Sequence, residues 1–151
     1  MSIINSKIPS FKVQAYHNDA FKTVSTEDLL GKWSIFFFYP ADFTFVCPTE
    51  LGDLADKYAE FQKLGVEVYS VSTDTHYVHL AWRNAHPDLA AIPFPMLADT
   101  KRELSTALGI LHKEDGVPLR ATFIVDPEGT IRFASVHDLS VGRNVMLAPG
   151  L

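Results

Sequence analysis

The chain has 151 residues and a formal net charge of −5, with 47% hydrophobic and 21% charged residues. This length is typical of a single domain that buries an ordinary hydrophobic core. The acidic balance gives no electrostatic reason to bind nucleic acid or an anionic membrane, so we expect neither as a partner.

The first half of the chain alternates between predicted strands and one long helix. Residues 11–24 alternate weakly around a His-Asn-Asp turn, which favours a hairpin, and residues 29–32 favour a short helical turn. The uninterrupted apolar run at 33–39 predicts a central strand that is buried on both faces. Helical spacing of apolar residues then predicts a helix over 47–64, and a second buried strand follows at 66–71.

Two further helices are predicted from residues that suit helix ends. Asp74 or Thr75 can cap a helix through Ala85, and Thr100 can cap another through Leu108. A proline or a glycine follows each of these segments, and both residue types end helices.

Short strands fill the remaining sequence, near 96–97, at 121–125 and at 130–136. The residues Asp-Pro-Glu-Gly at 126–129 predict a turn that joins the last two strands. Because strands alternate with helices, the pattern favours a mostly parallel α/β sheet with an antiparallel hairpin at its end.

The end of the sequence does not complete a helix. A helix start near 142–145 is followed by a single apolar turn before Pro149 and Gly150. One turn does not sustain a helix by itself. We therefore expect a domain at 1–145 and a disordered tail at 146–151.

Cys47 is the candidate nucleophile of the sequence. It lies at the junction of a predicted strand and a predicted helix, where unpaired N–H groups and the helix dipole stabilise a thiolate. A lone cysteine is also commonly a small buried hydrophobic residue, so its position alone leaves both interpretations open. Thr44 is by default a helix cap, although its hydroxyl can also donate to a bound substrate oxygen.

The segment PADFTFVCPTE around Cys47 resembles the active site of the peroxiredoxins, with the pattern P-x-x-x-T-x-x-C intact. The stretches FFFYPADFTFVCPTELGD and VYSVSTDTHYVHLAW are similar to the typical two-cysteine group, which includes the peroxidases of bacterial alkyl hydroperoxide reductases. The similarity runs from about Ile3 to Val145. It implies a thioredoxin-like α/β fold, with a central mixed sheet flanked by helices and a truncated C-terminal helix.

The resemblance implies a thiol peroxidase that serves antioxidant defence. It would reduce hydrogen peroxide and organic hydroperoxides through a cysteine sulfenic acid. Cys47 matches the attacking cysteine, Thr44 the threonine that hydrogen-bonds the peroxide, and Pro40 the proline that shields the thiolate from water. Arg120 matches the arginine that lowers the pKa of the thiol and positions the substrate. Without the resemblance, Arg120 would be interpreted as a surface charge at a strand end.

Glu50 and Arg143 match an ion pair that orients the catalytic arginine of the family. An acidic residue is also favourable near a helix start for purely electrostatic reasons, so Glu50 has a second interpretation. The resemblance implies no haem, flavin or metal cofactor. His76 and His79 have a spacing that suits metal ligands, but no third ligand is evident in the sequence.

Typical two-cysteine members resolve the sulfenic acid with a second cysteine in a C-terminal extension, whereas this sequence has one cysteine. We therefore expect impaired turnover unless an external reductant acts: a flavoprotein disulfide reductase, a thioredoxin-like protein or a small thiol. A natural truncation, a frameshift and an artificial ending all stay open as causes. One cysteine and the absence of a signal-peptide pattern favour the reducing cytoplasm.

The strand at 130–136 is a candidate sheet edge that would pair with its twin in a homodimer. The family assembles such dimers into rings of five, so a decamer is the larger assembly that the resemblance allows. A thioredoxin-like disulfide reductase is disfavoured, because Pro48, Thr49 and Glu50 follow Cys47 where a C-x-x-C motif needs a second cysteine. A holdase chaperone or interaction module is the non-enzymatic alternative, favoured by apolar surface that a shortened final helix would leave uncovered.

Overall fold

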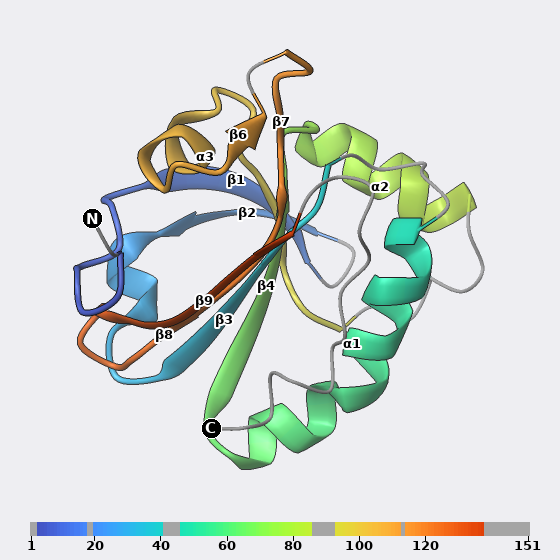
Figure 1. Cartoon of the computed structure of the whole chain (residues 1–151). Coiled ribbons are helices and arrows are strands. Elements are labelled where there is room, and N and C mark those ends of the chain that lie inside the picture. The colour runs from blue at the N-terminus through green and yellow to red at the C-terminus, as the bar shows by residue number, and fades with distance from the viewer. Residues whose placement is uncertain (1–2, 18–19, 41–45, 86–92, 113, 138–151) are drawn as a thin grey trace.

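The computed structural model describes residues 3–17, 20–40, 46–85, 93–112 and 114–137, with the backbone alone for 46–54. Helices lie on both sides of one large sheet (Figure 1). The helices are the 3-10 helix η1 (Thr26–Leu29) and the α-helices α1 (Val46–Lys63), α2 (His76–Ala85) and α3 (Glu103–Ala107). The strands are β1 (Lys12–His17), β2 (Ala20–Ser25), β3 (Trp33–Phe38), β4 (Val66–Ser72), β5 (Met96–Ala98), β6 (Leu111–His112), β7 (Val117–Pro118), β8 (Arg120–Val125) and β9 (Ile131–His137).

The main sheet is mixed and has seven strands in the order β2-β1-β5-β4-β3-β8-β9, while β6 and β7 form a separate pair. Only β3–β4 and β4–β5 are parallel within the main sheet, and its other pairs are antiparallel. The expectation of a mostly parallel sheet is therefore wrong. An apolar run predicts a buried strand but carries no information on which neighbour it pairs with or in which direction. The mixed sheet implied by the resemblance is confirmed.

β3 is the central strand that the apolar run predicts. Ile35 and Phe37 project to the face covered by α1 and α2, and Phe36 and Phe38 project to the face covered by η1 and α3. None of these four side chains is more than 2% exposed. Figure 1 shows α1 and α2 on one side of the sheet and α3 on the other. Because side chains alternate along the strand, β3 contributes to two hydrophobic cores, one on each face of the sheet.

The first two α-helices lie where their patterns predict them. α1 covers the predicted range to within one residue at each end, and Gly65 follows it with a left-handed φ of 76°. At α2 the side chain of Thr75 is the cap, because its Oγ1 accepts the N–H of Val78 at 3.2 Å. The end of α1 and the start of α2 thus agree with the local signals in the sequence.

The start of α3 differs from expectation, because Thr100 does not cap it. The helix begins at Glu103, and the buried carboxylate of Asp99 accepts the N–H groups of Leu104 at 3.1 Å and Ser105 at 2.8 Å. Asp99 directly follows β5 and reaches the helix over several intervening residues. A capping residue is normally close to its helix in sequence, so the sequence pattern favoured Thr100 over Asp99.

The two predicted hairpins are present. β1 and β2 pair from Lys12 opposite Ser25 to His17 opposite Ala20. At the other hairpin the N–H of Gly129 donates to the carbonyl of Asp126 at 3.0 Å, as a turn at 126–129 requires. The predicted helical turn at 29–32 begins earlier, as η1, because Ser25 and Asp28 form a capping box ahead of it.

The segment before β1 crosses to the far edge of the sheet and pairs with the start of β9. Asn5 N–H donates to Ile131 O at 2.8 Å, Ile131 N–H donates to Ser6 O at 2.9 Å, and Ile8 N–H donates to Gly129 O at 2.8 Å. This N-terminal cover, residues 3–8, is not among the elements that the sequence predicts. It leaves the later part of the outer edge of β9 without a strand partner in the part of the chain that the structure describes.

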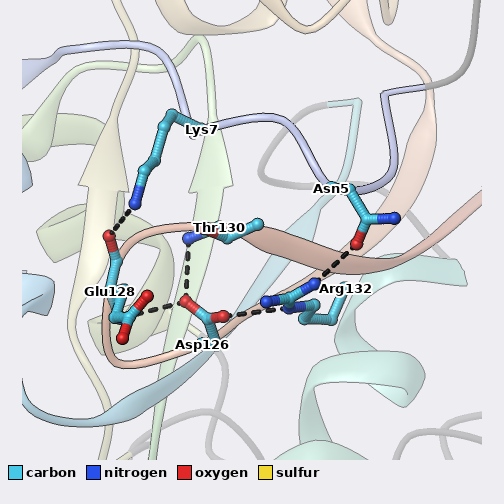
Figure 2. A network of polar contacts seen from close by, with 6 residues as sticks. All are labelled: Asn5, Lys7, Asp126, Glu128, Thr130 and Arg132. Atoms are coloured by element: carbon cyan, nitrogen blue, oxygen red, sulfur yellow. Dashed lines mark hydrogen bonds and ion pairs between the residues drawn. The ribbon is translucent and has the colours of Figure 1, made fainter.

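Asp126 connects the cover to the turn, as Figure 2 shows. Its carboxylate accepts the N–H groups of Glu128 and Thr130 and the Nε–H of Arg132, each at 2.9 Å. Arg132 Nη1 donates in turn to Asn5 Oδ1 at 2.6 Å. One side chain thus organises both the turn and the contact that holds the cover.

Two expectations fall on residues that are not described, namely the helix start at 142–145 and the tail at 146–151. The division into a domain at 1–145 and a tail therefore stays a prediction. No helix in the described ranges combines the length and apolar character needed to cross a membrane.

Candidate active site

The end of β3 and the start of α1 lie at the same edge of the sheet. α1 ends at Lys63, shortly before β4, and β4 starts beside the start of β3, with Val66 opposite Trp33. Its 18 residues span about 27 Å, so the helix runs back along the sheet towards the end of β3. Cys47 is the second residue of this helix. Its backbone therefore occupies the strand-to-helix junction that the sequence predicts.

Arg120 starts β8 at this same edge, because β8 runs antiparallel to β3. Thr122 pairs with Phe37 near the end of β3, and Arg120 lies two residues nearer that edge. Alternation places Arg120 on the same face as Thr122 and Phe37, which is the face that α1 and α2 cover. The side chain is only 6% exposed. Its interpretation as a surface charge at a strand end is therefore wrong.

Pro40 lies two residues after the end of β3 and is half-buried. The preceding residue fixes this position, because Tyr39 is fully buried and its N–H donates to Val71 O at 3.0 Å. The structure thus brings Pro40, Arg120 and the first turn of α1 to one edge of the sheet. Thr44 and Arg143 lie outside the described residues, as do the side chains of Cys47 and Glu50.

Aromatic side chains form an apolar floor beneath this edge. Tyr39 and Trp82 are fully buried, with ring centroids 5.8 Å apart, and Phe37 belongs to the same core. Tyr58 of α1 joins the same core nearer the opposite edge of the sheet, where it donates its hydroxyl to Glu67, at the start of β4, at 2.7 Å. Burial, reinforced by this bond, raises the pKa of Tyr58 well above its usual value. Beneath the edge where Arg120 lies, the buried rings of Tyr39 and Trp82 exclude water, so the charge of a nearby guanidinium acts more strongly than it does in water.

A polar pair on β9 faces Arg120 and Thr122, and the sequence analysis did not identify it. His137 lies opposite Arg120, and Ser135 lies opposite Thr122. Ser135 Oγ and His137 Nε2 share a hydrogen bond of 2.8 Å. The sequence carries no direct signal for this pair, because the register shifts by one residue between Ile124 and Val125. Extrapolation from the turn at 126–129 would place Val136, and not His137, opposite Arg120.

The histidines with metal-like spacing take separate structural positions. His79 is fully buried, and its Nε2 is 2.9 Å from Leu97 O. The ring of His76 instead packs against Phe21 and Tyr77, at centroid distances of 4.6 and 4.2 Å. Among the residues whose placement is described, no three His, Cys, Asp or Glu side chains are grouped to hold a metal ion.

Known proteins match nearly the whole chain. The AhpC/TSA family matches residues 4–134. Alkyl hydroperoxide reductase C of Salmonella typhimurium is 51% identical over 144 residues, which are 95% of this chain and 77% of that protein. The protein of the same name from Escherichia coli strain K12 is 50% identical over the same lengths.

Solved structures agree with this result. The crystal structure of Enterococcus faecalis AhpC has a TM-score of 0.97 and 52% identity, and the match covers 99% of this chain and 89% of that one. Reduced 2-Cys peroxiredoxin of Plasmodium vivax has a TM-score of 0.92 at 31% identity, over 98% of this chain and 79% of that one. The expected thioredoxin-like α/β fold is confirmed.

Proposed function

The chain belongs to the AhpC/TSA family, and from that membership we propose that Cys47 is the group with which it attacks peroxides. The protein is a peroxiredoxin, a thiol-dependent peroxidase, as the motif around Cys47 predicts. The assignment of individual residues to the reaction is our proposal. Its main support is the burial of Arg120 at the edge where α1 begins.

The proposed reaction transfers one oxygen atom to sulfur. The Cys47 thiolate attacks one oxygen of R–O–O–H, so that an S–O bond forms while the O–O bond breaks. The departing alkoxide or hydroxide takes up a proton and leaves as an alcohol or water. Cys47 is thereby oxidised to a sulfenic acid, and the peroxide is reduced.

Two features favour ionisation of Cys47. The unpaired N–H groups and the dipole at the start of α1 place partial positive charge beside the second residue of that helix. Arg120, which is buried on the sheet face that α1 covers, adds a full positive charge. Both favour the thiolate over the thiol, which lowers the pKa of a cysteine. We therefore assign Arg120 to stabilising the thiolate and holding the peroxide.

The remaining assignments rest on the motif. Thr44 would donate its hydroxyl to the peroxide, and Pro40 would keep water from the thiolate. Pro40 is half-buried just beyond the end of β3, which suits that role. Glu50 and Arg143 would form the ion pair that orients Arg120. These four roles remain proposals for this chain.

The regenerating thiol must come from outside these 151 residues, because Cys47 is the one cysteine among them. A flavoprotein disulfide reductase, a thioredoxin-like protein or a small thiol would each supply it. The name of the bacterial relatives, alkyl hydroperoxide reductase C, favours organic hydroperoxides as substrates beside hydrogen peroxide. We place this antioxidant reaction in the cytoplasm, where reducing thiol pools keep a lone cysteine reduced.

We further propose that the protein forms homodimers through β9. This strand ends the sheet order, and Val136 on it is 50% exposed. A larger ring needs a second surface, and our candidate is an aromatic cluster in which the exposed Phe21 and Tyr77 pack around the half-buried His76. The cluster lies at the start of α2, which follows the end of β4 at the same edge of the sheet as the proposed peroxide site.

The test of the proposed function compares the unaltered protein with Cys47→Ser. After one equivalent of hydrogen peroxide, we expect mass spectrometry to detect one added oxygen on the unaltered protein and none on the variant. With an added small thiol, the unaltered protein should consume peroxide continuously while Cys47→Ser does not. A variant that keeps its fold and still consumes peroxide at the original rate would exclude Cys47 as the nucleophile.

A further inference from the structure

Polar side chains interrupt an otherwise apolar stretch of the sheet face that α1 covers. Further along the same two strands, Ile124 and Phe133 pack into the core beneath α1. Towards the peroxide edge, the corresponding positions on β8 and β9 carry four polar residues, which are Arg120, Thr122, Ser135 and His137. Apolar residues would pack better at such positions, so the polar cluster calls for a reason other than packing.

His137 is the direct cross-strand neighbour of Arg120. The register of β8 and β9 places the two residues opposite each other, and residues paired in this way project to the same face. Their Cβ atoms are then about 4.5–5.5 Å apart, which lets the side chains touch. β9 is the last strand in the sheet order. His137 therefore stands between the buried Arg120 and the outer edge of the sheet.

The imidazole of His137 is fixed in place by Ser135. The two residues lie on the same face of β9, two positions apart, and share the 2.8 Å hydrogen bond between Oγ and Nε2. Both side chains are half-buried, which limits competition from water. A bonded, half-buried imidazole samples few rotamers, so it presents a constant flat surface to the arginine.

We propose that His137, fixed by Ser135, is a positioning residue for the Arg120 guanidinium. It blocks the space towards the sheet edge, which leaves the guanidinium directed towards α1, whose first turn contains Cys47. An arginine has several rotatable bonds and loses much conformational freedom when held in one geometry. A neighbour that excludes the unproductive rotamers keeps the charge where the thiolate and peroxide need it. This inference rests on the proposed role of Arg120.

Three variants test the pair. We expect His137→Ala to slow the oxidation of Cys47 by hydrogen peroxide about tenfold, within the range of couplings between contacting residues. It should also raise the apparent pKa of Cys47, measured by the pH dependence of its alkylation. Ser135→Ala should act in the same direction but more weakly, and His137→Gln, whose amide can still bond to Ser135, should restore most of the rate. His112→Ala, a histidine change on the separate β6–β7 pair, is the matched control and should leave both quantities unchanged.

A double-mutant cycle with Arg120→Ala separates this inference from the function on which it rests. If His137 acts through Arg120, adding His137→Ala to Arg120→Ala should slow oxidation no further. A single Arg120→Ala variant that reacts at the original rate would refute the proposed role of Arg120 itself. If Arg120→Ala is slow but His137→Ala and Ser135→Ala are not, the positioning role is refuted. An additional loss in the double variant would also refute it. Light scattering on each variant checks that a slower rate does not reflect altered assembly.

Discussion

His17 shows how one half-buried titratable side chain couples this fold to pH. Its Nε2 lies 2.8 Å from Pro93 O, which ties the end of β1 to the segment before β5. Lys22 Nζ donates to its Nδ1 at 2.9 Å. Burial chiefly lowers the pKa of His17, and the positive charges of Lys22 and Arg83 add to that effect. The folded protein therefore favours the neutral imidazole.

The sign of the resulting pH dependence follows from linkage. Because the pKa of His17 is lower in the folded state than its usual value of about 6.5, its stabilising contribution is complete above that value. The contribution is lost as the pH falls through the folded-state pKa. We expect thermal unfolding midpoints to drop as the pH falls below about 6.5 more steeply for the unaltered protein than for His17→Gln. Equal slopes for both proteins would show that His17 does not titrate in this way.

At the scale of elements, the carboxylate of Asp126 links the N-terminal cover to the turn, beside the backbone hydrogen bonds that pair the two segments. Asp126 accepts hydrogen bonds from two backbone N–H groups of the turn and from the side chain of Arg132. Arg132 in turn donates a hydrogen bond to Asn5 of the cover (Figure 2). The hydrogen bond from the backbone of Thr130 is the main reason that the pKa of Asp126 lies below its usual value. Ionised Asp126 therefore stabilises the folded state above about pH 4, and this contribution is lost as the pH falls through the lower folded-state value.

Replacing Asp126 should loosen both the turn and the cover. We expect Asp126→Ala to lower the free energy of unfolding at neutral pH by about 1–3 kcal/mol, because buried N–H groups lose their acceptor. Limited proteolysis should then cut within residues 3–8 earlier than in the unaltered protein. Glu128→Ala is the matched control, because Glu128 joins the network through its backbone. The difference between Asp126→Ala and the unaltered protein should shrink as the pH falls below about 4. A constant difference would contradict the role of the charge.

Elements that depend on neighbouring residues were predictable from the sequence, and those that depend on distant partners were not. The apolar run of β3, the cap at Thr75 and the turn before Gly129 are local signals, and all three are present. The cap of α3 by Asp99 and the cover on β9 require contacts between segments that the sequence does not place together. The same limit applies to the candidate site. The motif identified Arg120, but its neighbour His137 depends on the register of β8 and β9.

At the scale of the whole molecule, the cover limits where a second copy can pair. Residues 5–8 already occupy the outer edge of the hairpin at 129–131. The later part of β9, which includes the half-exposed Val136, is the stretch left for the proposed dimer. Unpaired strand edges readily accept a second strand, and like charges placed directly opposite each other oppose that pairing.

We expect Val136→Lys to weaken the homodimer, because two-fold pairing would bring the new charge close to its own copy. Light scattering over a range of concentrations should show a shift towards monomer, with a dissociation constant raised at least about tenfold. Leu64→Lys makes the same chemical change at an exposed residue after α1 and should leave the assembly unchanged. A protein that is monomeric at all concentrations before any substitution would refute the dimer.

The cover also has a consequence for the order in which the protein becomes structured during synthesis. Lys7 donates to the carbonyl of Glu128 across 121 residues of sequence. A ribosome adds about 5–20 residues per second, so roughly 6–25 s pass between the synthesis of these two partners. The hairpin of β1 and β2 can close from local residues, whereas the segment before it must wait for the synthesis of residues 128–131. The cover is therefore synthesised before the hairpin of β1 and β2 but is fixed in place after it.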